Sequence, residues 1–257
     1  MTRAHPRAVL SPDAVFPGAL TLTVDGVTQS TVLPGDPEQL LLEYVRRIGN
    51  AIDALAPEGQ QLRALHLGAG ALTLPRFIAA TRLGSRQIVV EHDVTLLDLV
   101  LDRLPLPEGE PIALITADAL EAVQALSAQA FEAFDVIVVD VYDALVAPGF
   151  VYLQEFFGDL EELRTPEGIV IVNVVDGPAL QASRAGYAAM SETIPATIVV
   201  GPAPLLEGER FGNAVLIGGK ADTLERMLPL LNARGPHPAA SAGIDGTRAL
   251  LGSAAAD

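Results

Sequence analysis

The chain has 257 residues, of which 50% are hydrophobic, and a formal net charge of −16 from 32 acidic and 16 basic residues. It contains no Cys, which excludes disulfides and thiolate chemistry. It has no apolar run of about 18 residues or more, as a membrane span would need. The acidic charge disfavours nucleic acid as a partner and favours a small cationic substrate, although such a charge also serves solubility alone. We therefore expect a soluble, cytoplasmic protein.

The N-terminal region, residues 1–36, is predicted to be an arm followed by a β-hairpin. Residues 1–17 contain several prolines and no periodic pattern, which indicates an extended arm. Two β-rich runs then flank Asp25-Gly26, a pair that is typical of two-residue hairpin turns. Asp36 is a suitable N-cap for a helix over 38–55, whose apolar residues recur at helical spacing on one face.

Strands and helices alternate from residue 62 onward, which predicts a doubly wound, Rossmann-like α/β sheet over 37–234. The last two strands are separated by about ten residues without a helical pattern, so we expect them to pair antiparallel at the edge. This gives seven mostly parallel strands, as in the class I methyltransferase-like fold. Residues 235–257 are rich in small residues and are predicted to form a flexible tail. The predicted strands are 62–67, 87–91, 112–116, 134–140, 168–175, 196–200 and 211–218.

Three features at the ends of the first three of these strands indicate an adenosyl site. Gly68 and Gly70 form a turn before a helix, where the backbone can approach a ligand closely. Glu91 ends the next strand, about twenty residues later, where an acid can bind ribose hydroxyls. Asp118 follows the third strand and is suited to accept from an adenine amino group. Each residue alone also fits a structural role, as a tight turn or a helix cap.

Asp140 and Asp143 follow the fourth strand and are predicted to face the same pocket. Burial and mutual repulsion would raise the pKa of at least one of them unless a cation lies between them, and a cationic amine would suit. A metal is the alternative, but the sequence supplies no further ligands at suitable spacing, so no metal is expected. His66 lies within a strand, where a histidine is more often a satisfied core residue, and His92 could line the pocket rim.

Several motifs resemble the spermidine synthases, or polyamine aminopropyltransferases, over residues 20–218. The segment DGVTQS resembles the family's D-G-x-x-Q-x, and FDVIVVDVYD resembles F-D-V-I-[IV]-x-D-x-x-D. TADA and VVEHD resemble the segments around the adenine-binding and ribose-binding acids. The resemblance implies decarboxylated S-adenosylmethionine as donor, a diamine such as putrescine as acceptor, and methylthioadenosine as by-product. Family members are commonly dimers or tetramers, so it also allows a homodimer.

The resemblance implies a role for each matching residue. Gln29 would reach the nucleoside, Glu91 would hold the ribose, and Asp118 with Ala119 would contact the adenine, beside the Gly68–Gly70 turn. Asp140 would orient and deprotonate the attacking amine. Asp143 would help to anchor the acceptor.

The sequence departs from the family pattern in three places. The family's turn is G-G-G-D-G, and Ala71 replaces the Asp that would bind the donor's aminopropyl ammonium. The family's Y-H-E-M segment is missing, and Tyr44 is a loose substitute for its Tyr. Ala144 stands where the family has Pro. These departures leave two alternatives open, which are an S-adenosylmethionine-dependent methyltransferase and a non-catalytic member that binds a nucleoside or a protein partner. A nicotinamide oxidoreductase ranks last, because nothing in the sequence suggests a hydride-transfer site and Thr73 stands in place of the third glycine of a G-x-G-x-x-G fingerprint.

Overall fold

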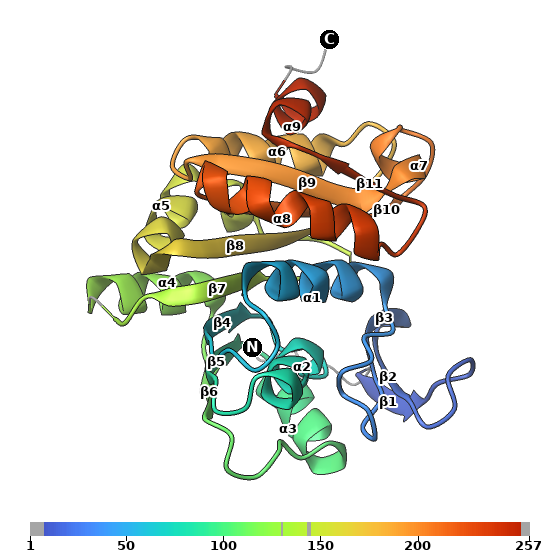
Figure 1. Cartoon of the computed structure of the whole chain (residues 1–257). Coiled ribbons are helices and arrows are strands. Elements are labelled where there is room, and N and C mark those ends of the chain that lie inside the picture. The colour runs from blue at the N-terminus through green and yellow to red at the C-terminus, as the bar shows by residue number, and fades with distance from the viewer. Residues whose placement is uncertain (1–7, 130, 143–144, 253–257) are drawn as a thin grey trace.

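The computed structural model describes residues 8–129, 131–142 and 145–252, and its centre is an eight-stranded sheet (Figure 1). The strand order is β6-β5-β4-β7-β8-β10-β9-β11. The bounds of these strands are β4 (Arg63–Leu67), β5 (Arg86–Glu91), β6 (Ile112–Thr116), β7 (Phe134–Val139), β8 (Arg164–Asp176), β9 (Ala196–Pro202), β10 (Gly212–Gly219) and β11 (Ala239–Ala242).

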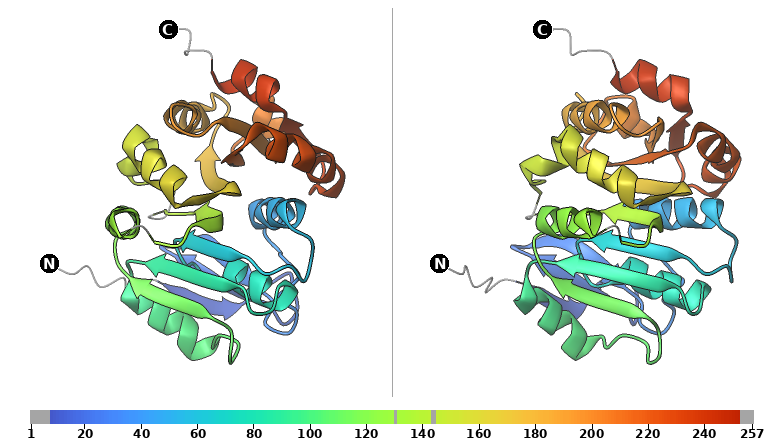
Figure 2. Two further views of the ribbon diagram at one scale, coloured as in Figure 1. Left: turned by 60° about the vertical axis from the view of Figure 1, so that its left-hand side comes forward. Right: turned by 90° about the vertical axis from the view of Figure 1, so that its left-hand side faces the viewer.

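Strands β4 to β8 are parallel, whereas β10 lies antiparallel between β8 and β9. This arrangement confirms the predicted Rossmann-like sheet and the antiparallel pairing of its last two predicted strands, β9 and β10, although β11 rather than this pair forms the edge. The parallel strands are apolar on both faces because helices cover both faces (Figure 2). On one face lie α1 (Glu43–Leu55), α2 (Thr73–Thr81) and α8 (Ala221–Arg234), and on the other α4 (Ala119–Ala128), α5 (Gln154–Leu163) and α6 (Gln181–Ser191).

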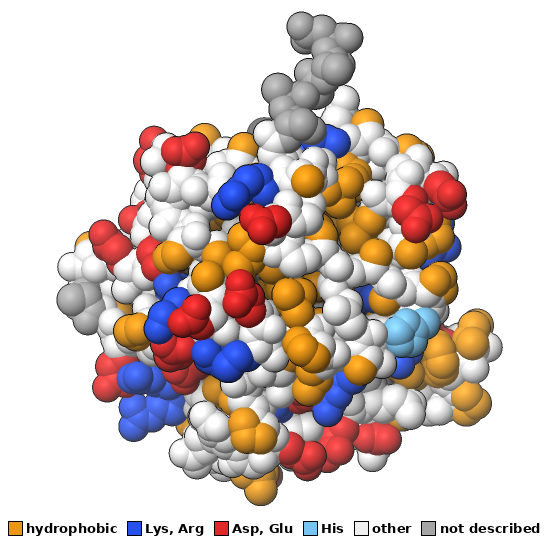
Figure 3. Space-filling view, turned by 45° about the horizontal axis from the view of Figure 1, so that its top comes forward, with side chains coloured by type: hydrophobic (Ala, Val, Ile, Leu, Met, Phe, Trp, Pro, Cys, Tyr) orange, Lys and Arg blue, Asp and Glu red, His pale blue; other side chains and the backbone are white. Residues whose placement is uncertain are grey.

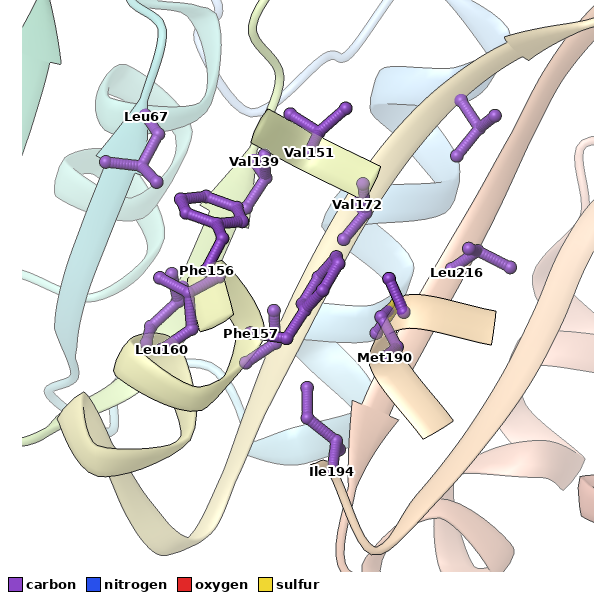
Figure 4. Close-up of a cluster of buried hydrophobic side chains, with 14 of the residues drawn as sticks. Leu67, Val139, Val151, Phe156, Phe157, Leu160, Val172, Met190, Ile194 and Leu216 are labelled. Atoms are coloured by element: carbon purple, nitrogen blue, oxygen red, sulfur yellow. The ribbon is translucent and has the colours of Figure 1, made fainter. Parts of the chain in front are cut away.

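The largest apolar cluster lies between the sheet and the helices α4, α5 and α6 (Figure 4). Phe156 and Phe157 of α5 are fully buried there and contact each other edge to face, with ring centroids 5.5 Å apart. Leu67 of β4 and Val139 of β7 belong to the same cluster. These two strands therefore enter the core with their apolar side chains, which fixes where the residues after them emerge.

The small N-terminal sheet consists of β1 (Val9–Pro12), β2 (Leu20–Val24) and β3 (Val27–Val32), all antiparallel. The predicted hairpin is confirmed, because Asp25 and Gly26 form its turn with φ angles of 51° and 81°. Both angles lie in the left-handed region that Asp-Gly favours in two-residue turns. The sheet shares an apolar cluster with the turn at 69–72 and with α3 (Val94–Arg103).

The structure corrects the predicted start of the first long helix. Asp36 is not its N-cap, because α1 begins at Glu43. The preceding segment forms turns, and Leu40 folds back onto α1 beside Gly49, where a Cβ would lie 2.3 Å from Leu40 Cδ1. Burying Leu40 against α1 is possible only if the chain reverses before the helix begins. The missing side chain of Gly49 provides the room.

The segment expected to be a flexible tail also differs from the prediction. Residues 239–242 form β11, an eighth strand, which pairs antiparallel with β9 and is followed by α9 (Ile244–Leu251). Thr247 accepts a hydrogen bond from the N–H of Val199 at 2.9 Å, and Leu251 is buried. Alanine-rich residues give no alternating pattern, so the strand forms through backbone pairing at the edge rather than through a recognisable apolar face.

Two short helical segments lie in the connections between the longer elements. A 3₁₀ turn, η1 (Gly149–Tyr152), precedes α5, and α7 (Ala203–Leu206) connects β9 to β10. Within the described ranges, no helix combines the length and apolarity needed to cross a membrane. On the face shown in Figure 3, acidic side chains lie among basic and hydrophobic ones, so the negative charge does not form one continuous patch there.

Candidate active site

A cavity of about 600 Å³ opens at the carboxyl ends of β4, β5, β6 and β7. Ligands bind at this edge in open α/β sheets. Strand β3 and helix α1 border it on the side of the small sheet. The cavity brings together the predicted site residues Gln29, Gly68, Gly70, Glu91, Asp118, Ala119 and Asp140. Asp143 lies outside the described residues.

The Gly turn after β4 requires both of its glycines. Gly68 has a φ of 93°, and a Cβ there would lie 2.2 Å from the carbonyl oxygen of Asp140. Gly70 has a φ of 49°, and its Cβ would lie 2.4 Å from Ser30 Oγ. Ser30 also accepts a hydrogen bond from the N–H of Ala71 at 3.1 Å. The turn is therefore held between β7 on one side and the N-terminal hairpin on the other.

Glu91 reaches from the end of β5 into the cavity and fastens the Gly turn. Its Oε2 accepts from the N–H of Ala69 at 3.0 Å, and its Oε1 accepts from the N–H of Asp93 at 2.9 Å. His92 Nδ1 lies 3.1 Å from Oε1. Burial acts to raise the pKa of Glu91, but the hydrogen bonds from His92, Asp93 and Ala69 outweigh it and lower the pKa below its ordinary value. Glu91 is therefore an anion, and a carboxylate has about four acceptor positions, of which these contacts use three.

Asp118 stands at the start of α4 and on the wall of the cavity. Its Oδ1 accepts from the N–H groups of Leu120 at 2.9 Å and Glu121 at 3.3 Å, so it is the N-cap of that helix. The next residue, Ala119, is buried and also lines the cavity. The cap and a ligand contact are compatible, because capping uses only one of the two carboxylate oxygens.

Asp140 follows β7 directly, and hydrogen bonds hold both of its carboxylate oxygens. Asn173 Nδ2 donates to Oδ1 at 2.7 Å, and the Tyr44 hydroxyl donates to Oδ2 at 3.2 Å. Burial raises the pKa of Asp140 above its ordinary value, and these two hydrogen bonds oppose the rise. Burial and the Asp140 charge raise the pKa of Tyr44 well above its ordinary value, so its hydroxyl remains a donor. The result is a positioned carboxylate that holds a proton more readily than an exposed one.

The position of Asn173 follows from the sheet register. Val139 of β7 pairs with Val172 of β8, so the next residues, Asp140 and Asn173, lie side by side. Asn213 of β10 donates from Nδ2 to Asn173 Oδ1 at 3.0 Å, which turns the Asn173 amide so that its nitrogen faces Asp140. Sequence reasoning missed Asn173 and Asn213. The only signal was a polar residue inside the apolar run 169–175.

Ala71, at the position of the family's aminopropyl-binding Asp, does not line the cavity. It is fully buried and packs in the apolar cluster of the small sheet, together with Leu22, Leu72 and Leu96. A side chain at this position points into that cluster. An acid here would therefore meet leucines rather than a ligand.

Acidic side chains dominate the charge around the cavity. Its acidic residues are Glu91, Asp93, Asp118 and Asp140, and no Lys or Arg lines it in the part of the chain that the structure covers. A cationic ligand is favoured by such a wall. Among the described residues, no three His, Asp or Glu side chains converge as they would to hold a metal ion.

Comparisons of the chain with protein-family models and with curated proteins find no match. Comparison with solved structures finds a probable spermidine synthase from Corynebacterium glutamicum ATCC 13032, with a TM-score of 0.83 and 26% identity. The match covers 97% of this chain and 92% of that one. A spermidine synthase from Thermotoga maritima matches with a TM-score of 0.60, 15% identity, and coverage of 94% of this chain and 79% of that one.

Human methyltransferase-like protein 13, in complex with SAH, has the same fold, with a TM-score of 0.59 and 21% identity over 76% of this chain and 92% of that one. The resemblance expected from the motifs is thus confirmed at the level of the whole chain. The structural neighbours are transferases of two kinds that share one Rossmann-like scaffold. The chain fits a divergent, spermidine synthase-like member of this group.

Proposed function

We propose that the protein transfers an aminopropyl group from decarboxylated S-adenosylmethionine to an amine acceptor such as putrescine, releasing methylthioadenosine. The observation that carries this proposal is the Asp140 carboxylate, held at both oxygens by Asn173 and Tyr44 in a cavity lined by acids. An acidic wall would attract a cationic acceptor and would offer no such attraction to an uncharged acceptor of a methyl group.

The donor's nucleoside is assigned to the end of the cavity formed by β5 and β6. Glu91 is ionised and has acceptor capacity for a ribose hydroxyl, and Asp118 and Ala119 stand where an adenine would lie. Gln29 faces the cavity from the hairpin. Solved structures of the same fold support an adenosyl ligand, because one spermidine synthase was solved with the transition-state analogue AdoDATO and the human protein with SAH.

Asp140 supplies the proton chemistry of the proposed reaction. An alkylammonium has a pKa of about 10 and no lone pair, so it must lose a proton before attack. Asp140 accepts that proton, and its raised pKa improves it as a base. The amine nitrogen then bonds to the methylene carbon beside the sulfonium while the carbon–sulfur bond breaks, and sulfur keeps the electron pair as a neutral thioether. Alignment of nitrogen, carbon and sulfur supplies much of the remaining rate.

The acceptor is proposed to be a small cationic amine. The acidic wall draws a cation toward Asp140, and the wall beyond it is largely apolar, formed by Val141, Val146, Ala147 and Phe150. These apolar residues suit the methylene chain between two amino groups. The anchoring role of Asp143 remains a prediction from the resemblance.

A second function, methyl transfer from S-adenosylmethionine, is favoured by one observation. Ala71 faces an apolar cluster, so the acid that would favour a decarboxylated donor is absent from its expected place. A nucleoside-binding protein without catalytic activity would also retain Glu91 and the Gly turn.

One experiment separates these functions. Purified protein is incubated with either donor and a panel of di- and polyamines, and mass spectrometry follows methylthioadenosine and S-adenosylhomocysteine. Methylthioadenosine that forms only with an amine, and is lost in Asp140→Asn but kept in the exposed control Asp102→Asn, supports aminopropyl transfer. S-adenosylhomocysteine would assign the protein to the methyltransferases. Binding of methylthioadenosine without any turnover would indicate a non-catalytic member.

A further inference from the structure

His66 of β4 is a buried histidine with one ring nitrogen engaged and one available. It lines the cavity, and its Nε2 lies 3.0 Å from Gln87 Oε1. Gln87 Nε2 donates to the carbonyl oxygen of Pro75 at 3.0 Å, which fixes the amide so that its oxygen faces His66. Nε2 must therefore carry the hydrogen. Burial lowers the pKa of His66 to about 4, so the ring is neutral and Nδ1 is a hydrogen-bond acceptor.

Nδ1 has no hydrogen-bond partner among the described residues, in contrast to a satisfied core histidine. The Gln87 link to Pro75 places the ring beside the first turn of α2. The wall of the same cavity also includes Tyr44 and Val45 of α1 and Thr73 of α2. This polar pair of His66 and Gln87 interrupts two strands that are otherwise apolar, which a purely structural core would not need.

Thr73 opens α2 on the same wall and is a second unused polar group. It is only 9% exposed, and its Oγ1 has no hydrogen-bond partner within the described chain. Thr73 lines the cavity, and threonine in a helix populates two χ1 rotamers, so a rotation about χ1 is the motion by which its covered hydroxyl would meet a ligand there. A buried hydroxyl without a partner costs stability, and a ligand that bonds to it removes that cost.

We propose that His66 and Thr73 form a neutral subsite that binds the amino group at the tail of the sulfonium donor. The inference rests on the proposed function, because it assumes an adenosyl sulfonium in this cavity. The subsite takes the place of the acid that Ala71 replaces. It adjoins the Gly turn, which lies between Glu91 at the ribose end and Asp140 at the reacting end.

The chemistry of the two groups selects an amino group over a carboxylate. A neutral imidazole nitrogen with a lone pair accepts hydrogen bonds and repels a carboxylate oxygen, which can only accept. The threonine hydroxyl can accept a second hydrogen bond from the same ammonium. Both groups are uncharged, so the subsite binds the amine through hydrogen bonds and needs no buried carboxylate.

The test compares Thr73→Val with the unmodified protein by isothermal titration calorimetry. The ligands are decarboxylated S-adenosylmethionine and S-adenosylmethionine, whose tails carry an amino group, and methylthioadenosine, which has none. Thr73→Val should weaken binding of both amine-bearing ligands about ten-fold and leave methylthioadenosine unchanged. The fold should survive, because the hydroxyl has no hydrogen-bond partner among the described residues and valine has nearly the same shape.

Thr197→Val is the matched control, because Thr197 on β9 is buried, its Oγ1 has no partner among the described residues, and it does not line the cavity. It should bind all three ligands like the unmodified protein. A second variant tests the histidine by combining His66→Leu with Gln87→Leu, which removes both partners of the hydrogen bond between them, and with Gln87 the hydrogen bond to the Pro75 carbonyl. It should show the same selective loss for the amine-bearing ligands.

The outcomes separate the two proposals. If the unmodified protein binds none of the three ligands, the proposed function fails and the subsite with it. If it binds them and Thr73→Val and the double variant bind them equally well, only the subsite is refuted. An equal loss for methylthioadenosine would also overturn the assignment, because that ligand has no tail amine.

Discussion

The half-buried carboxylate of Asp140 should cost the fold stability, and the substitution Asp140→Asn tests this without any assay of activity. The amide is nearly isosteric and keeps the hydrogen bonds. Its oxygen still accepts from Asn173 Nδ2, and its nitrogen can donate to the Tyr44 hydroxyl. Tyr44 then donates to the carbonyl oxygen of Gln29, which already lies 3.2 Å away. The substitution therefore removes a half-buried charge and keeps a hydrogen-bond partner for the amide oxygen and for one of its N–H groups.

The expected gain is about 1 kcal/mol of unfolding free energy near neutral pH, the usual scale for relieving a destabilised functional group. For a chain of this size that corresponds to a rise in Tm of about 2–4 °C. The pKa of Asp140 is raised in the folded protein, so ionisation costs the native state stability as pH rises through that value. The gain should be present at pH 8 and should disappear as the pH falls below the pKa of Asp140.

Differential scanning calorimetry at several pH values between 4 and 8 measures the effect. The control is Asp102→Asn, which changes an exposed carboxylate on α3 and should shift Tm little at any pH. A variant Asp140→Asn that is less stable at pH 8 would refute the reasoning. So would a gain that does not depend on pH, because it could not come from the charge.

Three further predictions concern the Gly turn and its surroundings. Gly68→Ala should lower the unfolding free energy by about 2 kcal/mol or more, measured by urea denaturation, because its Cβ would meet the carbonyl oxygen of Asp140 and its φ is 93°. Glu91→Gln should weaken methylthioadenosine binding at least about ten-fold in calorimetry, since the amide nitrogen cannot accept a hydrogen bond; unchanged affinity would remove Glu91 from the nucleoside site. Ala71→Asp should destabilise the protein by several kcal/mol in thermal unfolding without improving donor binding, because the acid enters an apolar cluster. Tighter binding of decarboxylated S-adenosylmethionine to this variant would contradict the prediction and show that the turn can rearrange.

The fold was predictable because its signals are local. Apolar runs that alternate with segments of helical periodicity predicted the parallel sheet, and Asp25-Gly26 predicted the hairpin turn. The start of α1 could not be predicted from the sequence, because it depends on the packing of Leu40 against Gly49. Strand β11 could not be predicted either, because its four small residues form a strand only by pairing with the edge of β9.

Some residues of the candidate site could likewise be predicted from the sequence, and others could not. The residues that follow strands directly, such as Glu91 and Asp140, could be predicted to lie at one edge of the sheet. Asn173 could not, because its partnership with Asp140 depends on the register of β7 against β8. The acceptor nitrogen of His66 was missed because it follows from a chain of two hydrogen bonds that no spacing in the sequence encodes.

The hydrogen bond between Ser30 and the Gly turn couples the stability of the small N-terminal sheet to the stability of the whole molecule. Ser30 accepts from the N–H of Ala71, and the sheet's inner leucines share a cluster with the turn and α3. The two sheets should consequently melt in a single cooperative transition. Removing or exchanging the first 36 residues would destabilise the Gly turn. This segment is therefore not an independent module that could be swapped between related proteins.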